Sequence, residues 1–314
     1  MKMKIISMVV SVLFGFNAQA LAEQPTPGFN HKVPAYIMTP DTVQTRIGTM
    51  NFFDGMPDDE TVRKVYDNLD FIRGVDVFLN FLPATSIEGI RLGMKSMGAE
   101  DYNEVLIFDD LMDSSPLFLT GNTDTVYALA MLDLEKSGAT VVEIPAGAGP
   151  GTVNDAFFRF VVDMGAPGPD AQKGGIYIIL PPDYQGELKP TLNGMQDRDK
   201  DTRTEVTIAG QQAKAWISQS TSYNNWLVLR GFLKDGKTDF SSNIFRSGLK
   251  IYPLDSAAKP KAMKFVNGSG KFFNTIHANN YKFYEELWHV LQKEPLSFID
   301  PELRGQASAI GIQK

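Results

Sequence analysis

Cysteine is absent from this chain of 314 residues. Disulfide bonds, thiolate catalysis and cysteine-ligated zinc are therefore excluded, and an ordinary hydrophobic core has to stabilise the fold. Histidine is almost as scarce, because His31, His277 and His289 are the only three, and no two of them have the spacing of zinc ligands. The sequence predicts no metal site built from these residue types.

The chain also has fewer basic residues than acidic ones. Lysine and arginine number 30 against 37 aspartates and glutamates, which gives a formal net charge of -7. Nucleic acids and anionic lipids bind positively charged surfaces, so this balance argues against nucleic acid as a partner. An acidic ligand would need a local group of basic side chains.

A long membrane-spanning segment is not found at the N-terminus. Lys2 and Lys4 precede an apolar run from Ile5 to Phe16, and small residues follow at Ala20 and Ala22. The run has about 12 residues, whereas a helix needs roughly 20 to cross a bilayer. We therefore expect residues 1–22 to be a cleaved signal peptide of a periplasmic or secreted protein with no membrane span after cleavage. A retained anchor helix is the alternative.

The region after this segment changes from extended to helical in character. Residues 23–47 are rich in proline and glycine at their start, which predicts an extended arm. Apolar residues at helical spacing then predict one helix that ends near Pro83 and a second one capped by Thr85 or Ser86. The residues that carry this pattern are Val62, Val65, Leu69, Ile72, Phe78, Ile87, Ile90 and Met94.

Short runs of β-branched and aromatic residues dominate the sequence after Asp101. Glycine, proline, asparagine and aspartate separate these runs, and no helical pattern lies between them, which predicts antiparallel sheets. The runs are 105–108, 125–133, 140–144, 157–163, 175–180, 206–208, 213–217 and 226–233. We expect a mainly β protein of the α+β class: an antiparallel β-sandwich or jelly-roll-like domain with N-terminal and C-terminal helices.

The expected domain organisation follows from these patterns. Residues 48–254 form a helical lead-in and the β domain, residues 255–271 form a linker loop, and residues 272–314 form a C-terminal helical segment. In this last segment, Asp300 and Pro301 resemble an N-cap and a first-turn proline.

The stretch from Gly121 to Pro145 is the most distinctive part of the sequence. It begins with Asn-x-Asp-Thr-x-Tyr, continues to Asp-Leu-Glu, and closes an apolar strand with Glu-x-Pro. Further motifs follow in order, namely Phe158–Asp163, Tyr177–Pro181, Trp226–Gly231 and Asn274–His277. Together they resemble the bacterial domain of unknown function 1254 from roughly Gly48 onward. The resemblance implies a second, all-β domain of unknown function 1214 after this region. The sequence stops at Lys314, before such a domain. We therefore expect either that a separate chain supplies the second domain in trans or that this form has lost the function that needs it.

Candidate site residues come from strand parity, because residues two apart share a face. If three such faces meet, they bring together two carboxylates, two guanidiniums, a phenol and an indole. Aromatic rings stack on sugars, arginine binds carboxylates with two hydrogen bonds, and tyrosine or aspartate moves protons. We therefore interpret Tyr127, Asp133, Arg159 and Asp163 as catalytic candidates and Trp226 and Arg230 as ligand-binding candidates.

Three further residues are ligand-binding candidates. Asn122 and Asp124 open their strand, where such side chains either shape a turn or contact a ligand. His277 precedes the C-terminal helix and is either an acid or base at the site or a capping or core residue. For the strand residues, the alternative is that Arg159 pairs with Asp163 and that Trp226 belongs to the core.

Cofactor signatures are not recognisable. The stretch 147–151 is glycine-rich but has a proline where a phosphate-binding loop would enter its helix. The stretch 197–201 alternates carboxylates as a calcium loop does, but Thr202 and Ile208 replace the turn glycine and the closing glutamate, which excludes an EF-hand. A looser calcium or manganese site and a solvated loop both remain open. No cofactor is assigned.

Two functional hypotheses remain open. The first is an enzyme that acts on an oligosaccharide or another polar small molecule, and it predicts that the candidate residues face one cleft. The second is a noncatalytic binding or assembly module, such as a homo-oligomer or one that pairs with a second domain in trans. It predicts that the same residues are paired or buried, and that an apolar patch is exposed near Ile310 and Ile312.

Overall fold

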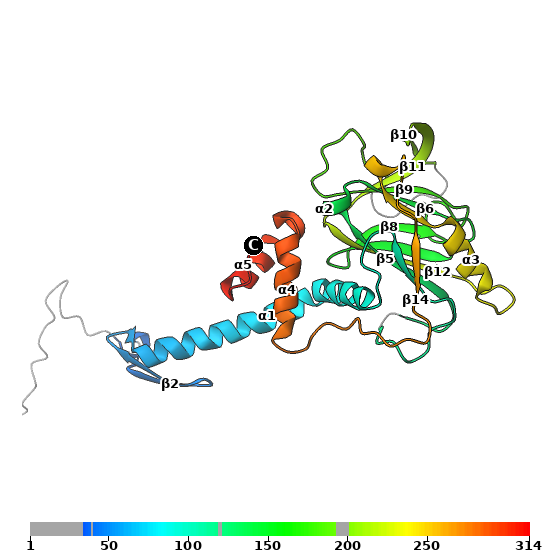
Figure 1. Cartoon of the computed structure of the whole chain (residues 1–314). Helices are drawn as coiled ribbons and strands as arrows, with labels where there is room; N and C mark the ends of the chain where they lie inside the picture. The colour runs from blue at the N-terminus through cyan, green and yellow to red at the C-terminus, as the bar shows by residue number, and fades with distance from the viewer. Residues whose placement is uncertain (1–33, 39, 119–120, 193–200) are drawn as a thin grey trace, which may run out of the picture. The chain divides into compact units, whose positions relative to one another are not determined.

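The computed structural model describes residues 34–38, 40–118, 121–192 and 201–314 (Figure 1). These residues divide into two compact units, of which one ends at Tyr66 and the other runs from Asp67 to Lys314. The predicted signal peptide, His31 and residues 197–200 of the calcium-like loop lie outside the described residues.

The first unit contains a small antiparallel sheet. A 3₁₀ turn (Ala35–Ile37) comes first, and β1 (Thr42–Thr45) then pairs with β2 (Gly48–Phe53), which pairs with β3 (Met56–Pro57). The prediction of an extended arm up to residue 47 is therefore wrong for its last residues. Threonine and valine in β1 favour a strand, and the hairpin supplies a hydrogen-bonding partner for it.

Helix α1 (Asp59–Ser96) is continuous, so the prediction of two helices separated at Pro83 is wrong. Proline removes one backbone donor, but buried neighbours on both sides of Pro83 hold the helix in place. Val77 and Phe81 pack with the C-terminal helices, and Ile87 and Met94 pack on a sheet. Thr85 does not cap a new helix; its hydroxyl donates to the carbonyl oxygen of Phe81 at 3.2 Å.

Two sheets make up the β domain of the second unit. The five-stranded sheet has the order β10 (Thr204–Ile208), β11 (Gln211–Gln219), β9 (Gly175–Leu180), β6 (Thr140–Ile144), β13 (Lys250–Pro253). The six-stranded sheet has the order β14 (Lys264–Asn267), β4 (Glu104–Ile107), β5 (Val126–Asp133), β12 (Asn224–Gly231), β7 (Pro150–Asp155), β8 (Phe160–Gly165). All strand pairs are antiparallel except β9 with β11 and β4 with β14.

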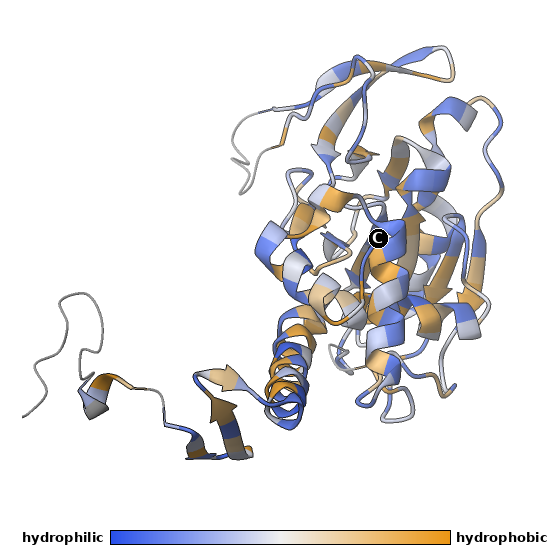
Figure 2. Ribbon diagram, turned by 90° about the vertical axis from the view of Figure 1, so that its left-hand side faces the viewer, coloured by the Kyte–Doolittle hydropathy of each residue, from blue (hydrophilic) through white to orange (hydrophobic). Residues whose placement is uncertain are grey.

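The main hydrophobic core lies between these sheets. Alternate residues of β5 and β12, such as Ala128 and Leu227, meet Val142, Tyr177 and Trp216 of the other sheet. Figure 2 shows hydrophobic segments along these strands. The predicted α+β class with a largely antiparallel sandwich is confirmed, but the jelly-roll variant is not. Two short helices, α2 (Leu134–Ser137) and α3 (Asp239–Gly248), and a 3₁₀ turn (Leu254–Ser256) complete the domain.

The predicted linker at 255–271 contains strand β14, which corrects that part of the domain scheme. Its backbone pairs with β4, and Phe265 packs against the main core while Val266 packs against the core under α1. Alternation over only four residues is too short to distinguish a strand from a loop in the sequence.

Helices close the chain, as predicted. They are α4 (Lys282–Lys293) and α5 (Pro301–Ala309), joined through a 3₁₀ turn (Leu296–Phe298). Asp300 caps α5 by accepting a hydrogen bond from the backbone N of Glu302 at 2.8 Å. Ile312 is buried in the cluster formed by these helices and α1, so the predicted exposed patch at this residue is wrong. No helix in the described ranges is long and apolar enough to cross a membrane.

Candidate functional site

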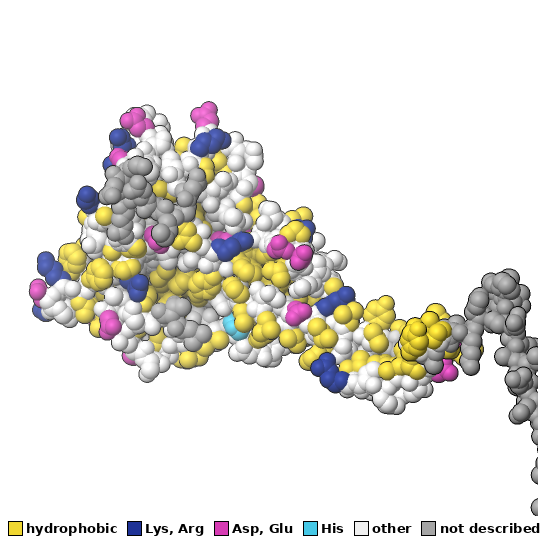
Figure 3. All heavy atoms as spheres, turned by 180° about the vertical axis from the view of Figure 1, so that it is seen from behind, with side chains coloured by type: hydrophobic (Ala, Val, Ile, Leu, Met, Phe, Trp, Pro, Cys, Tyr) yellow, Lys and Arg dark blue, Asp and Glu magenta, His cyan; other side chains and the backbone are white. Residues whose placement is uncertain are grey.

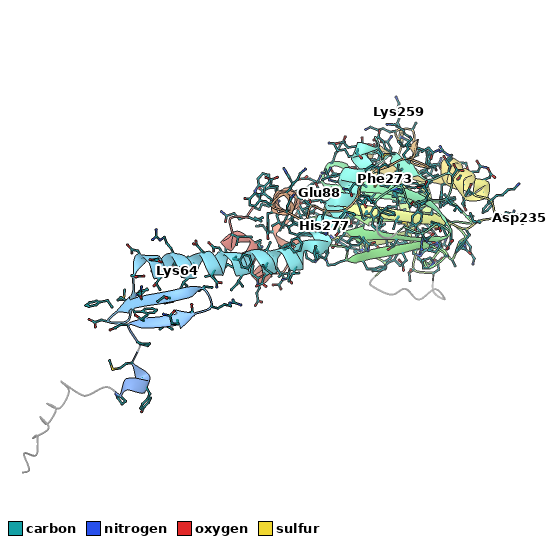
Figure 4. All side chains as sticks on the ribbon, turned by 90° about the horizontal axis from the view of Figure 1, so that it is seen from below. Lys64, Glu88, Asp235, Lys259, Phe273 and His277 are labelled. Carbon is teal, nitrogen blue, oxygen red and sulfur yellow. The ribbon has the colours of Figure 1, made fainter. Side chains whose placement is uncertain are left out.

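The outer face of the six-stranded sheet, which points away from the other sheet, carries the candidate site. Tyr127, Leu129 and Met131 of β5 and Trp226 of β12 point to this face, since they are one residue out of step with the inward core residues. Helix α1 packs against part of this face through Ile87, Ile90 and Met94. Figure 4 shows Phe273 and His277 on the segment before α4, which runs close to this helix.

A cavity of about 310 Å³ opens on the same face. It brings together four of the candidate residues that the sequence indicates: Tyr127, Asp163, Trp226 and Arg230. The other lining residues are Pro150, Gly151, Thr152, Pro167 and Val228. The strands that carry these residues also expose aromatic rings, because Phe160 is 47% exposed and Phe232, directly after β12, is 48% exposed. Hydrophobic side chains form a band on the surface seen in Figure 3.

Sheet register fixes the relative positions of the polar groups. Arg230 pairs with Tyr127 across β12 and β5. Val228 pairs with Thr152, which in turn pairs with Asp163, so these three form a row across β12, β7 and β8. Arg230 lies two strands and two residues away from Asp163, which places their Cα atoms roughly 12 Å apart.

The two charged groups of the cavity lack side-chain partners among the described residues. Within the described part of the chain, neither the Arg230 guanidinium nor the Asp163 carboxylate forms an ion pair or a side-chain hydrogen bond. Both residues are partly exposed. The guanidinium N–H donors of Arg230 and the carboxylate oxygens of Asp163 therefore line the same cavity without a bond to another described side chain.

Trp226 forms a wall of the cavity rather than an open stacking platform. It is 3% exposed, and its ring meets Phe118 and Phe158 edge-on, with centroids 6.1 and 5.7 Å away. Its Nε1 is buried and has no hydrogen-bond partner in the part of the chain that the structure describes. The alternative in which Trp226 belongs to the core thus describes its packing better, although it still lines the cavity.

Tyr127 and the residues that open β5 form one hydrogen-bonded turn. The Tyr127 hydroxyl accepts from the backbone N of Asn122 at 3.1 Å. The Asn122 side-chain oxygen accepts from the backbone N of Asp124 and from the hydroxyl of Thr125, both at 3.0 Å. Asn122 therefore shapes the turn, as one of its two interpretations predicts. Asp124 is exposed and does not line the cavity.

Arg159 does not share a face with Asp163, so both interpretations of this pair are wrong. Its Nε donates to the buried carboxylate of Asp155 at 2.6 Å. A bulge between Val153 and Asn154 shifts the register of β7 and β8, and Arg159 lies in the turn before β8 begins. Parity counted from the sequence does not hold through a bulge and a turn.

Asp133 lies in a different cavity, of about 620 Å³, at the far end of β5. Its carboxylate pairs with Lys293 and accepts from the backbone N of Lys136 at 3.2 Å. Glu88 and Arg91 in this cavity also pair with each other, through two hydrogen bonds of 2.6 and 2.7 Å. Six residues of strand separate Asp133 from Tyr127, roughly 20 Å, so a shared face did not mean a shared site.

His277 is a packed residue that lines neither of these cavities. Its Nδ1 lies 2.9 Å from the carbonyl oxygen of Ala278. Its ring meets Phe78 and Phe283 edge-on, with centroids 6.3 and 5.6 Å away. The core interpretation of this histidine agrees with the structure.

Sequence reasoning missed Thr152, Pro150 and Val228. The first two belong to β7, which is rich in glycine and proline and was not predicted as a strand. The adjacent β-branched residues Thr152 and Val153, between turn residues, were the available signal. Val228 was inside a predicted strand but carried no functional group.

Comparison with known proteins finds a matching family model and indicates no activity. A family model described as "Protein of unknown function (DUF1254)" matches residues 102–253, a range that includes every residue of the 310 Å³ cavity. No curated protein matches the chain. A matching solved structure is the crystal structure of the VPA0106 protein from Vibrio parahaemolyticus, with 15% sequence identity and a TM-score of 0.46. The match covers 78% of this chain and 52% of that one, so the chain spans about half the length of that protein.

Proposed function

We propose that the protein binds a sugar or another small polar molecule in the cavity formed by residues of the 102–253 region, which matches the DUF1254 family model, whose description assigns no activity. The observation that carries the proposal is that Arg230 and Asp163 line one cavity and that neither has an ion-pair partner among the described residues. Its volume of about 310 Å³ lies at the lower end of the range of roughly 300–1,000 Å³ for ligand pockets.

Charged side chains with a structural role in this protein form ion pairs with other side chains. Arg159 pairs with Asp155, and Lys293 pairs with Asp133. A partly buried charge loses hydration, and a partner within the protein normally compensates for this loss. Arg230 and Asp163 lack such a partner among the described residues, which supports a ligand as the partner.

The enzymatic form of this proposal rests on Asp163. A carboxylate on the cavity wall can accept a proton from a bound hydroxyl, and the Tyr127 side chain, which lies across from Arg230, adds a second oxygen to the wall. Release of a product from a bound oligosaccharide, lost in Asp163→Asn, would distinguish an enzyme from a binding protein.

Export belongs to the proposal as well. Lys2 and Lys4 before the short apolar run support a signal peptide and a periplasmic or secreted location. Cell fractionation, with mass spectrometry of the N-terminus of the mature protein, tests it. A cytoplasmic protein that retains Met1 would overturn this part.

Assembly is a second candidate function, favoured by the exposed apolar side chains of α1. Phe71, Val75 and Leu79 recur at four-residue spacing and are 71%, 41% and 58% exposed. Apolar patches of this kind commonly mark association surfaces. Light scattering over a range of concentrations should show a dimer of this chain that Phe71→Ser with Leu79→Ser dissociates. A concentration-independent monomer would remove this candidate.

Ligand-dependent thermal unfolding tests the binding proposal directly. A ligand that binds only the native state stabilises it by about 2.7 kcal/mol at a hundredfold excess over its dissociation constant. We expect a rise in Tm with acidic oligosaccharides that Arg230→Ala and Asp163→Asn both abolish, and a rise with neutral oligosaccharides that Asp163→Asn abolishes. Arg73→Ala, on α1 and outside the cavity, is the matched control and should keep the response. A folded protein with no response to any of these sugars would overturn the proposal.

A further inference from the structure

Resting on the proposed function, we infer that the natural ligand is a sugar acid about the size of one sugar ring, with its carboxylate on Arg230 and its hydroxyl groups toward Asp163. The cavity offers one guanidinium and one carboxylate, and no described residue neutralises either. The ligand must therefore present an anion at one end and hydrogen-bond donors at the other.

Arg230 selects the acidic end. Its planar fork matches a carboxylate in two parallel hydrogen bonds, which a neutral hydroxyl cannot reproduce. The cavity has no second cation among its lining residues. A singly charged carboxylate is therefore favoured over a phosphate dianion, whose second charge would face only Asp163 and the net negative charge of the protein.

Asp163 selects the other end of the ligand. An ionised carboxylate accepts hydrogen bonds and donates none, so it requires hydroxyl or ammonium groups. It also repels a second acidic group, which disfavours diacids. The side chain lies across β7 from Val228, so the ligand has to pass over Val228 and Thr152 to reach it from Arg230.

The distance between the two residues sets the size of the ligand. Their Cα atoms are separated by roughly 12 Å, as derived from the sheet register. Both side chains rise from the same face of the sheet, and with the guanidinium and the carboxylate directly above their Cα atoms, two hydrogen bonds of about 2.8 Å each leave roughly 6 Å between the polar ends of the ligand. A single ring with its carboxylate and opposite hydroxyl fills this gap, whereas acetate or glycolate reaches only one end. Val228, Pro150 and Pro167 supply apolar surface for the C–H face of such a ring.

Titration calorimetry with four matched compounds tests this inference: a hexose, its uronate, its 6-phosphate and acetate. We expect the uronate to bind at least tenfold more tightly than the other three. Arg230→Gln should reduce uronate affinity at least tenfold, because it removes the charged partner of the carboxylate, and should reduce hexose affinity much less. Arg230→Lys keeps the charge and should recover only part of the loss. Asp163→Asn should weaken binding of the hexose and the uronate alike.

The possible failures are distinguishable. If hexose and uronate bind equally and Arg230→Gln changes neither, the assignment of a sugar acid is wrong while the binding function stands. Tighter binding of the 6-phosphate than of the uronate also overturns the assignment. If none of the four binds the folded wild-type protein, both this inference and the proposed function fail. Unfolding curves of Arg230→Gln and Arg230→Lys, expected to match the wild type, show that lost binding is not lost folding.

Discussion

The ring of Phe158 lies edge-on against the indole of Trp226, with the ring centroids 5.7 Å apart. Phe158 holds this position with φ of 61°, in the left-handed region that bulky residues rarely adopt. The turn that imposes this backbone is fixed by Asp155, whose carboxylate accepts from the backbone N of Phe157 and of Arg159, both at 2.8 Å. A strained residue therefore supports a wall of the proposed ligand cavity.

Phe158→Gly should be more stable than Phe158→Ala by about 1 kcal/mol. Both substitutions remove the ring, but only glycine adopts a positive φ without the cost of about 1–2 kcal/mol for an L-residue. At ordinary positions the order is the opposite, because glycine loses more entropy on folding. Urea denaturation of the two variants measures the difference. An alanine variant that equals or exceeds the glycine variant in free energy of unfolding would show that the turn carries no strain.

Asp155→Ala should cost about 3 kcal/mol of stability or more, and Arg159→Ala about 1–2 kcal/mol. Asp155 is 1% exposed, and its loss leaves two backbone N–H groups and the Thr221 hydroxyl without their acceptor. Loss of Arg159 leaves the carboxylate with these three donors. Equilibrium denaturation gives both values, and the opposite order would contradict this account of the turn.

Arg159→Ala also tests whether Arg159 belongs to the ligand site, as strand parity predicted, or lies outside it, as in the structure. Arg159 does not line the cavity, so its truncation should leave ligand affinity within about twofold under conditions where the protein is folded, whereas loss of a direct charged contact costs tenfold or more. Calorimetry with whichever ligand the cavity binds measures this. A tenfold loss of affinity would show that Arg159 contacts the ligand and that its position outside the site is wrong.

Gly89→Ala should destabilise the protein by about 1–3 kcal/mol, although alanine is the better helix former by about 1 kcal/mol. A Cβ at position 89 would lie 2.5 Å from the carbonyl oxygen of Thr275, where the segment before α4 crosses α1. Gly74→Ala is the matched control on the same helix. Its Cβ would meet only the Tyr284 hydroxyl, at 3.5 Å, so the helix preference should prevail. Thermal unfolding of both variants tests whether the crossing is this close, and a stabilised Gly89→Ala would refute it.

Local patterns predicted the strands of the domain well where apolar runs were long. Strands β5 and β12 contain long apolar runs, and parity along each of them placed Tyr127, Trp226 and Arg230 on the outer face. Strand β7 was missed, because glycine and proline at its start conceal the pattern. Helix α1 was divided at Pro83, because buried contacts far away in sequence override the local preference of proline.

The site was only partly predictable, because two decisive facts are tertiary. The bulge in β7 and the turn before β8 take Arg159 away from Asp163, and no residue pattern marks that bulge. Helix α1 covers part of the outer sheet face and leaves the rest open to the cavity. The sequence of α1 does not indicate which strands it packs against. Parity therefore identifies residues that share a face, whereas packing decides which of them meet.

Glu294 gives the fold a pH dependence near neutrality. Its carboxylate is buried after the last residue of α4 and accepts from the backbone N of Tyr223 at 2.6 Å and of Asn224 at 3.1 Å. Burial raises the pKa of Glu294 to about 7, against the opposing effect of these hydrogen bonds. In the unfolded chain the pKa of the group returns to about 4.5.

This shift predicts a loss of stability as the pH rises from about 4.5 to 7. In that window the native state binds a proton that the unfolded state has released, so the contribution of Glu294 falls by up to 1.4 kcal/mol per pH unit. The carboxylates with lowered pKa, such as Asp101 and Glu104, have their ordinary pKa values of 3.8 and 4.5 in the unfolded chain, so they oppose this slope only at the lower end of the window. Glu294→Gln, which keeps an acceptor oxygen for one of the two N–H groups, should remove the slope. Free energies of unfolding at pH 5, 6 and 7 should therefore decline more steeply for the wild type than for Glu294→Gln, and parallel curves would show that Glu294 is already ionised at pH 5.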